Sequence, residues 1–299
     1  MASKLSHKGW EIKKLAHFSI EHMVDINKRQ ASFYDNIHDA DASHGYGYDN
    51  NPSANVFTRI WSHLRCRHQY FLIKAGIEQK VKETNLQWAK SRPHSDIFEL
   101  GCFTGGPLTF DFIELAKFYQ GIDLSSKAVE ALRKKIALKG LEEKAEVAVG
   151  DFLTMNSTRL FDIIYAHGVL HHFENPEIVF QKLHDLLKPD GALIFVEPSE
   201  YNLLYRLIRK IYRPFQSDTD WEWPFTENTI HCLYKYFTPI DGFGWGRWSL
   251  LLSVLGTLPI LRYLIFKLYI LLVSREIDQA FNNEVWYNPQ LTALCVRRA

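Results

Sequence analysis

From Asp96 onwards, short apolar runs alternate with longer stretches in which apolar residues recur at helical spacing. The apolar runs predict five strands, over residues 96–100, 118–124, 145–151, 161–167 and 191–198. The stretches between them predict helices over residues 108–116, 126–139 and 176–187. The last of these helices should end at KPDG, because Pro and Gly break helices. Strands that alternate with helices in this way are typical of parallel βαβ units, so the pattern predicts an α/β fold.

The region before the sheet, residues 1–92, is expected to form a helical cap. Helix-compatible spacing covers residues 18–31 and 57–85. Between them, the Gly-, Asp- and Asn-rich stretch 34–56 predicts a long loop, and loops of that length usually have a function. The aromatic and histidine side chains that could form a lid over a site are Tyr34, His38, His44 and Tyr46.

The region after the sheet predicts helices with unusual faces. In the stretch 203–213, one helical stripe carries Arg206, Arg209, Lys210 and Arg213, and the other side carries Leu204, Leu207, Ile208 and Ile211. This basic face is either a solvated face of a core helix or a contact for anionic lipid or a pyrophosphate-bearing acceptor. The stretch 248–273 is nearly all apolar, but it is interrupted by Gly256, Pro259, Arg262 and Lys267. A spanning helix needs about 20 mostly apolar residues, so two short helices are expected here.

These patterns predict four segments: a cap over 1–92, a sheet core over 93–200, a helical lid that binds the acceptor over 201–280, and final strands of the core sheet over 281–299. With 299 residues and 46% hydrophobic content, the chain can bury a core without a metal or a partner. The net charge of +1 argues against affinity for nucleic acid.

The cysteines and the N-terminus indicate the compartment. Cys66, Cys102, Cys232 and Cys295 lack the spacing of a zinc site or a disulfide framework, so neither is expected. Nor does any Asp/Glu/His cluster show ligand spacing, so no metal is expected. The N-terminal residues contain no apolar core as long as a signal peptide needs. A cytoplasmic protein is expected, with peripheral contact at the inner membrane surface through 203–273 as an additional hypothesis.

Acidic residues and glycines follow successive predicted strands. The first strand enters ELGCFTGGP, where Gly101 and Gly105 let backbone N–H groups approach a ligand. Asp123 lies 24 residues beyond Glu99, the position from which a carboxylate binds the ribose of a nucleoside cofactor, although it could instead cap the next helix. After the third strand, Asp151 offers a carboxylate to an adenine amino group. These groups predict a nucleoside-binding edge of the sheet.

The order of the motifs ELGCFTGG, GIDLS, VGDF, FDIIYAHGVLHHF and LLKPDGALIFVEP resembles the class I S-adenosylmethionine (SAM)-dependent methyltransferases, over about residues 96–198 or one third of the chain. The resemblance implies a Rossmann-like sheet of seven strands with the last strand antiparallel, and SAM as cofactor. It implies that Glu99, Gly101 and Gly105 frame the methionine end, that Asp123 holds the ribose, and that Asp151 and Phe152 lie at adenine. The other cofactor-binding residues expected are Tyr34, Cys102, Phe103, Leu124 and His167.

One position departs from the family pattern. Phe103 stands where the family's glycine turn G-x-G-x-G has its middle glycine. Its side chain must point away from the cofactor or narrow the pocket, so we expect a modified turn that still binds. The rival interpretation, a nicotinamide dehydrogenase, requires the spacing G-x-G-x-x-G, which is absent.

The acceptor side of the reaction is expected at the histidine pair after the fourth strand. Methylation of a hydroxyl group requires removal of a proton, and a histidine titrates close to neutral pH. We expect His171 to face the acceptor and His172 to pack against the sheet; the alternative is that LHH is only an architectural motif. The tail with WEWPFT is similar to methyltransferases encoded with bacterial surface-polysaccharide enzymes, which suggests a small-molecule, sugar or lipid-linked acceptor. N- or C-methylation and a non-catalytic SAM-binding scaffold remain alternatives, and the sequence indicates no oligomeric state.

Overall fold

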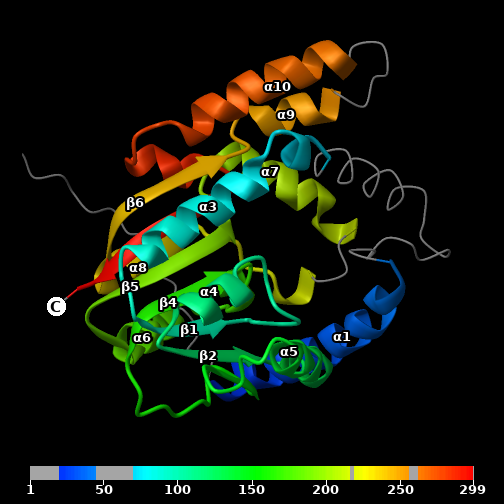
Figure 1. Cartoon of the computed structure of the whole chain (residues 1–299). Coiled ribbons are helices and arrows are strands. Elements are labelled where there is room, and N and C mark those ends of the chain that lie inside the picture. The colour runs from blue at the N-terminus through cyan, green and yellow to red at the C-terminus, as the bar shows by residue number, and fades with distance from the viewer. Residues whose placement is uncertain (1–19, 45–69, 216–218, 256–261, 299) are drawn as a thin grey trace, which may run out of the picture.

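The computed structural model describes residues 20–44, 70–215, 219–255 and 262–298. At its centre is a seven-stranded sheet in the order β3-β2-β1-β4-β5-β7-β6 (Figure 1). The strands are β1 Asp96–Leu100, β2 Phe118–Asp123, β3 Ala145–Val149, β4 Phe161–His167, β5 Leu187–Pro198, β6 Phe237–Trp245 and β7 Gln290–Arg297. Strands β1 to β5 are parallel, and β7 is antiparallel to both of its neighbours. The expected Rossmann-like sheet with a reversed last strand is confirmed.

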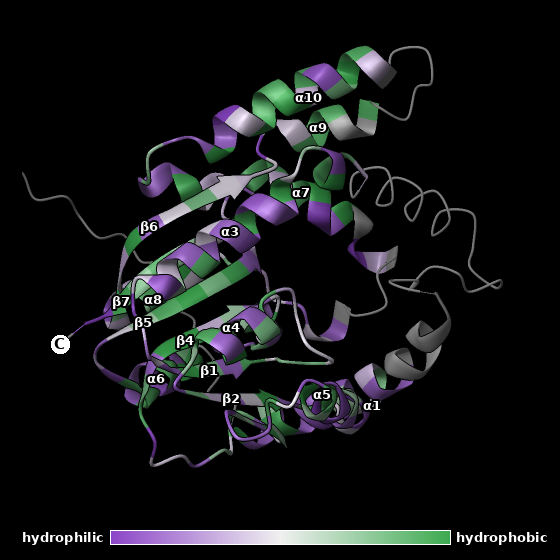
Figure 2. Ribbon diagram, in the orientation of Figure 1, coloured by the Kyte–Doolittle hydropathy of each residue, from purple (hydrophilic) through white to green (hydrophobic). Residues whose placement is uncertain are grey.

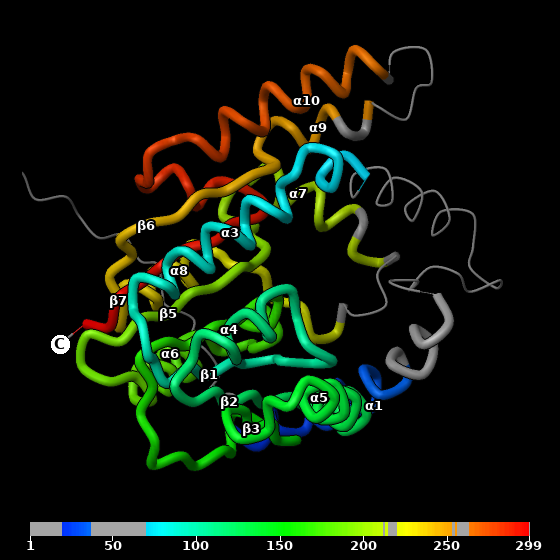
Figure 3. Tube along the Cα trace, in the orientation of Figure 1, coloured from blue at the N-terminus to red at the C-terminus, as the bar shows by residue number. Residues whose placement is uncertain are grey.

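Helices cover both faces of this sheet. One face is packed by α3 (Ile77–Lys90), α4 (Thr109–Leu115) and α5 (Ser126–Leu138). The other is packed by α6 (Pro176–Leu186) and α8 (Glu227–Tyr236). The other α-helices among the described residues are α1 (Ile20–His44), α7 (Leu203–Tyr212), α9 (Ser249–Leu255) and α10 (Arg262–Ile277). The Cα trace shows α1 beside α5, at the opposite end of the molecule from α9 and α10 (Figure 3).

The central strands are apolar on both faces because both faces are covered. In β1, Ile97 and Phe98 are both fully buried but belong to different hydrophobic clusters, one on each side of the sheet. Because the strands are mostly apolar, polar side chains that are open to solvent lie mainly where the strands end. Asp123 and His167, which end β2 and β4, are therefore brought to one edge of the sheet.

Two elements differ from the sequence expectation near the site. The stretch 34–56 was expected to be a loop, but its first part continues α1 to His44, whereas His38 and His44 side chains and Tyr46 lie outside what the structure describes. Tertiary hydrogen bonds from α1 to the core, described below, override the weak helical propensity of this stretch. As expected, α6 ends at Leu186, just before KPDG, but KPDG does not form a separate turn: it lies within β5, beside a register shift in the pairing with β4, and Asp190 has a φ of 63°.

The segment 201–280 is not purely helical, in contrast to the expected lid. It contains α8 and strand β6, which pairs with β7 as part of the core sheet. The alternation of β6 was obscured in the sequence by Pro239 and by the close glycines Gly242 and Gly244. Both glycines are required, because a Cβ atom would approach Thr292 O to 2.6 Å or Asn288 Cβ to 2.5 Å.

Only part of the basic stripe of α7 faces outwards, because Arg206 and Lys210 are exposed whereas Arg209 and Arg213 are turned inwards. The Arg209 side chain is only 11% exposed and lies near Glu200 and Glu222, while Arg213 donates to the Glu222 carbonyl oxygen at 2.7 Å. Most of its apolar residues are exposed as well: Leu203, Leu204, Leu207 and Ile211. The acidic partners Glu200 and Glu222 explain why Arg209 is turned inwards. Among the residues described, no helix has the length and apolar content required to cross a bilayer.

Candidate cofactor and active site

The turn after β1 has an unusual backbone conformation. Gly101 has a φ of 76°, and a Cβ atom there would lie 2.9 Å from Val169 Cγ2, so only glycine fits. Phe103 also adopts a left-handed conformation, with a φ of 42°, and its N–H donates to Asp123 Oδ2 at 2.9 Å. Its ring lies edge-on to Tyr34, with centroids 6.3 Å apart. The phenylalanine therefore takes the place of the missing glycine by contacts with β2 and α1.

Asp123 is held in a fixed orientation at the end of β2. Its Oδ1 accepts the Ser125 N–H at 2.8 Å, and its Oδ2 accepts the Phe103 N–H. Burial raises the pKa of Asp123 from 3.8 to about 6, although these backbone hydrogen bonds lower it. The cap of α5 is the Ser125 hydroxyl, which accepts from the Ala128 N–H at 3.1 Å. Asp123 is thus not needed as the cap, and its neighbour Leu124 is half-buried beside it.

Asp151 follows β3 and carries an unsatisfied oxygen. Its Oδ1 accepts from the Leu153 N–H at 2.8 Å and from the Asn27 amide of α1 at 2.9 Å. Its Oδ2 is buried and has no hydrogen-bond partner among the residues that the structure describes. A buried carboxylate oxygen without a donor is costly, so this atom fits a ligand that brings an N–H group, such as an adenine amino group.

Three other residues expected at the cofactor, Phe152, Cys102 and Glu99, make contacts within the core instead. Phe152 is a core residue, 3% exposed, between the rings of Phe98 and Phe173. Cys102 is fully buried, and its Sγ lies 3.0 Å from the position that a Cβ of Gly121 would take. The sequence could not show these directions, because a strand end exposes one of two adjacent residues and buries the other.

Glu99 is the third such residue. Its carboxylate accepts from the Thr109 hydroxyl at 2.9 and 3.0 Å and from the Tyr119 hydroxyl at 2.7 Å, all within the core. Burial raises the pKa of Glu99 to about 7 against these hydrogen bonds. The Gly106 N–H donates to the same Thr109 hydroxyl at 2.7 Å, so Glu99 supports the glycine turn through Thr109. By contrast, His167 is exposed at the end of β4, with its Nδ1 3.1 Å from the Tyr165 hydroxyl.

His171 is attached to the sheet through a buried carboxylate. Its Nδ1 lies 2.6 Å from Oε2 of Glu197, which is fully buried on β5. Glu197 Oε1 also accepts the N–H groups of Val169 and Leu170, at 2.9 and 2.7 Å. Burial raises the pKa of Glu197 to about 7, and these N–H groups lower it. Glu197 therefore fixes the turn from Val169 to His172, which we call the histidine turn.

His172 lies on the outer side of this turn, between α1 and the C-terminal region. Its Nδ1 is 2.8 Å from the Trp221 carbonyl oxygen, which can only accept, so Nδ1 carries the proton. Its Nε2 then accepts from the Tyr34 hydroxyl at 3.0 Å. The rings of His171 and His172 stack at 4.1 Å. This arrangement reverses the sequence expectation, since His171 is the residue packed against the sheet.

Helix α1 brings several residues to this edge; Tyr34 was expected from the sequence, whereas Asn27, Gln30 and Asp35 were not. Asn27, Gln30 and Tyr34 of α1 contact Asp151, the His172 carbonyl oxygen and the His172 ring, in that order along the helix. Their spacing of three and four residues places them on one helix face, which was the available signal. Asp35 of α1 accepts from the Ser125 hydroxyl at 2.6 Å. Helix α1 thus lies across the edge that the strand ends form.

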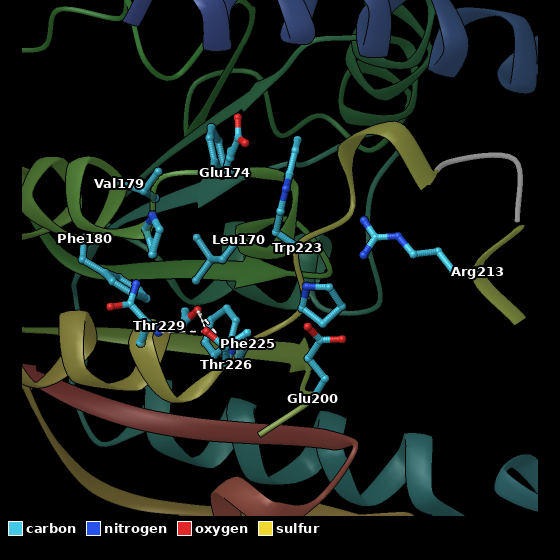
Figure 4. Close-up of a pocket in the computed structure, with 14 residues that line it drawn as sticks. Leu170, Glu174, Val179, Phe180, Glu200, Arg213, Trp223, Phe225, Thr226 and Thr229 are labelled. Carbon is cyan, nitrogen blue, oxygen red and sulfur yellow. Dashed lines mark hydrogen bonds between the residues drawn. The ribbon is translucent and has the colours of Figure 1, made fainter. Parts of the chain in front are cut away.

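A pocket of about 130 Å³ adjoins the histidine turn (Figure 4). Leu170 and Phe173 from the turn form one wall, and the segment from Trp223 to Thr229 forms another. The two walls are joined by the Trp223 N–H, which donates to the His171 carbonyl oxygen at 2.6 Å. Arg213 and Glu200 supply charge at its border, as Figure 4 shows. A mostly apolar pocket with a few charged groups suits a small organic molecule.

Comparisons with known proteins agree with this geometry. Residues 91–233 match the family described as "Methyltransferase domain". A ubiquinone biosynthesis O-methyltransferase from Glaesserella parasuis is 31% identical over 116 residues, which is 38% of this chain and 49% of that protein. A malonyl-[acyl-carrier protein] O-methyltransferase from Priestia megaterium is 30% identical over 33% of this chain and 35% of that protein. The chain thus spans about half or less of the length of these curated relatives.

A solved structure extends the likeness of the fold to most of the chain. Magnesium protoporphyrin IX methyltransferase from Synechocystis PCC 6803, with S-adenosylhomocysteine (SAH) bound, superposes with a TM-score of 0.54 at 16% identity. The superposition covers 92% of this chain and 100% of that one. At this identity the likeness concerns the fold. The motifs, the family match over residues 91–233 and the sheet topology thus agree with a class I SAM-dependent methyltransferase domain, a family whose cofactor is SAM.

Proposed function

We propose that the chain transfers the methyl group of SAM to a hydroxyl group of a small-molecule, sugar or lipid-linked acceptor, with a histidine as general base. The observation that carries the proposal is the position of the histidine turn at the same sheet edge as Asp123 and the unsatisfied oxygen of Asp151. A cofactor held by these carboxylates would have its reacting end close to the turn. The curated relatives named as O-methyltransferases support an oxygen acceptor.

The cofactor residues are assigned by their geometry. Asp123 would accept both ribose hydroxyl groups, and Asp151 Oδ2 would accept the adenine amino group. Gly101, Phe103 and Gly105 would line the methionine end with their backbone. Bound SAM supplies an electrophilic methyl group on its sulfonium, so the protein has to orient the acceptor, exclude water and remove a proton.

His172 is the better general base of the pair. Its Nδ1 proton is fixed by the Trp221 carbonyl oxygen, which leaves the basic lone pair on Nε2, where the Tyr34 hydroxyl now donates. An acceptor hydroxyl that replaces the Tyr34 hydroxyl would pass its proton to Nε2. His171, fixed by Glu197 and 7% exposed, is then a positioning residue that supports the turn. The pocket beside the turn would hold another part of the acceptor.

A methyl-acceptor screen with labelled SAM tests the proposal. Once an acceptor is found, His172→Ala should lower kcat by roughly 10²–10⁴ and leave SAM affinity nearly unchanged, because only proton removal is lost. The matched control is His231→Ala, since His231 is exposed on α8. If His171→Ala is inactive while His172→Ala turns over normally, the roles of the two histidines are exchanged.

Two other functions lead to different results. If both histidine variants remain active, the acceptor needs no histidine base, and methylation of nitrogen or carbon on a small metabolite takes the place of O-methylation. If SAM and SAH bind but no acceptor class is methylated, the chain is a SAM-binding regulatory or scaffold protein. The left-handed Phe103 in the glycine turn is the feature that favours this alternative.

A further inference from the structure

Helices α7, α9 and α10 carry an unusual number of exposed apolar side chains. Twelve large apolar or aromatic side chains on or next to them are exposed: Leu203, Leu204, Leu207, Ile211, Trp248, Leu251, Leu255, Tyr263, Leu264, Leu268, Ile270 and Leu271. We call these residues the apolar ridge. Figure 2 shows α9 and α10 together at one edge of the molecule, with hydrophobic residues recurring along them. A patch of this kind on a protein surface marks an interaction site.

The exposed apolar residues of α10 do not result from poor packing of this helix, because a different face of α10 is buried against the protein. Ile265, Tyr269 and Val273 recur every four residues and are buried in a cluster with Phe71 and strand β6. The outer face is apolar as well, although α10 does not lie inside the protein. A helix that is hydrophobic all round is normally buried on all sides, so the outer face of α10 requires a cover.

A buried carboxylate joins these helices into one unit. Glu276 of α10 accepts from the N–H groups of Gly246, Trp248 and Ser249 at 2.8, 2.6 and 3.0 Å, and from the Ser249 hydroxyl at 2.8 Å. Tyr205 of α7, also buried, donates to the carbonyl oxygen of Gly246 at 2.8 Å. The exposed ridge therefore lies on a supported scaffold.

The charges that accompany the ridge are positive. Arg206, Lys210, Lys267 and Arg275 are exposed on α7 and α10, whereas Glu276, the one acidic residue within these three helices, is buried. The acidic residues beside α7, Glu200 and Glu222, lie on its inner side near Arg209. An apolar surface bordered by cations, with Trp and Tyr among its exposed residues, complements the interface of a bilayer that contains anionic lipids.

We infer that the apolar ridge docks the protein onto an anionic membrane surface, with its apolar side chains inserted into one leaflet and Arg206, Lys210 and Lys267 at the headgroups. The ridge is connected to the proposed active site, because α7 is followed by the segment that carries Trp221 to the His172 ring. Docking would therefore bring the acceptor side of the site towards the membrane. The inference deepens the proposed function, but binding to vesicles is measured without any methyl acceptor.

Flotation of the purified full chain with lipid vesicles tests this surface. The wild type should float with vesicles of phosphatidylcholine and phosphatidylglycerol, less with phosphatidylcholine alone, and less as salt is added. Leu207→Glu combined with Leu264→Glu should reduce the bound fraction by about tenfold or more, because two charges would have to enter the apolar layer. The matched control is Leu138→Glu, since Leu138 is 87% exposed on α5, away from the ridge. SAM affinity, measured on each variant, should be unchanged and shows that the site is intact.

Three results would overturn the inference. The first is that the wild type does not float with anionic vesicles at low salt. The second is that Leu138→Glu reduces flotation as much as the ridge variant. The third is that the wild type sediments as a dimer that the ridge variant converts to a monomer, because a second copy of the chain would then cover the ridge. If the wild type floats with anionic vesicles but transfers no methyl group, the proposed function is refuted and the docking inference is not.

Discussion

The binding of SAM should depend on pH through Asp123. In the protein without cofactor, burial raises the pKa of this carboxyl from 3.8 to about 6, so it is largely protonated below that pH. Ribose hydroxyl groups donate to the ionised form, and binding therefore requires that Asp123 has lost its proton. The affinity for SAM should rise with pH up to about 6 and become constant above it.

The size of the effect follows from the same contacts. The shift of the pKa corresponds to about 3 kcal/mol by which burial disfavours the ionised carboxyl in the empty site. At a pH of about 5, SAM affinity should be about tenfold lower than at neutral pH, because protonation competes with binding. Asp123→Asn should bind SAM at least about tenfold more weakly at neutral pH, since each charge-assisted hydrogen bond contributes about 1.5–3 kcal/mol.

Isothermal titration calorimetry with SAM and SAH at several pH values measures both effects. The Asp123→Asn profile should be flat near pH 6, because the titrating group is gone. The control is Asp185→Asn, since the Asp185 side chain is 64% exposed on α6, and its profile should match that of the wild type. An unchanged dissociation constant in Asp123→Asn, or a wild-type affinity that does not depend on pH, would refute the assignment of the ribose to Asp123.

Three further changes test the support of the site. In the wild type, the carboxyl pKa of Glu99 is raised to about 7, so the fold should lose about 3 kcal/mol of stability as Glu99 ionises between a pH of about 4.5 and about 8. Glu99→Gln has no carboxyl to ionise, so its unfolding free energy should fall less over this pH range. Equal pH profiles of the unfolding free energy in the two proteins would contradict this. Gly101→Ala should lower the unfolding free energy by about 1–3 kcal/mol in denaturant titrations, because the left-handed backbone and Val169 both oppose a Cβ atom; an unchanged midpoint would argue against it. Asn27→Ala should weaken SAM by about two- to tenfold in calorimetry, because Asp151 loses a hydrogen bond of about 0.5–1.5 kcal/mol that orients it; tighter binding would show that Asn27 competes with the cofactor.

Much of the fold could be predicted because strands and helices in the core have distinct apolar periods. The five predicted strands correspond to β1 to β5, since each is a short apolar run between amphipathic stretches. Strand β6 was missed because Pro239 and two glycines interrupt its alternation. The extension of α1 to His44 was missed because its stability comes from contacts with strand ends more than 80 residues away, such as that of Asp35 with Ser125.

Residue types at the site were more predictable than directions. The positions of Asp123 and Asp151 follow from their places after strands, because parallel strands end at one edge. The orientation of the histidine pair depends on Glu197, which lies 26 residues away in β5 and binds three N–H groups and a ring nitrogen. No local pattern indicates that contact. In the same way, the inward direction of Arg209 depends on Glu222, which follows α7 in a separate segment.

The most direct test of the central claim is titration of the purified full chain with SAM and with SAH. If the strand ends form a methyltransferase cofactor site, both should bind at one site per chain, should compete with each other, and should lose affinity together in Asp123→Asn and Asp151→Asn. A chain that is folded, as judged by a cooperative unfolding transition, but that binds neither compound would contradict the account.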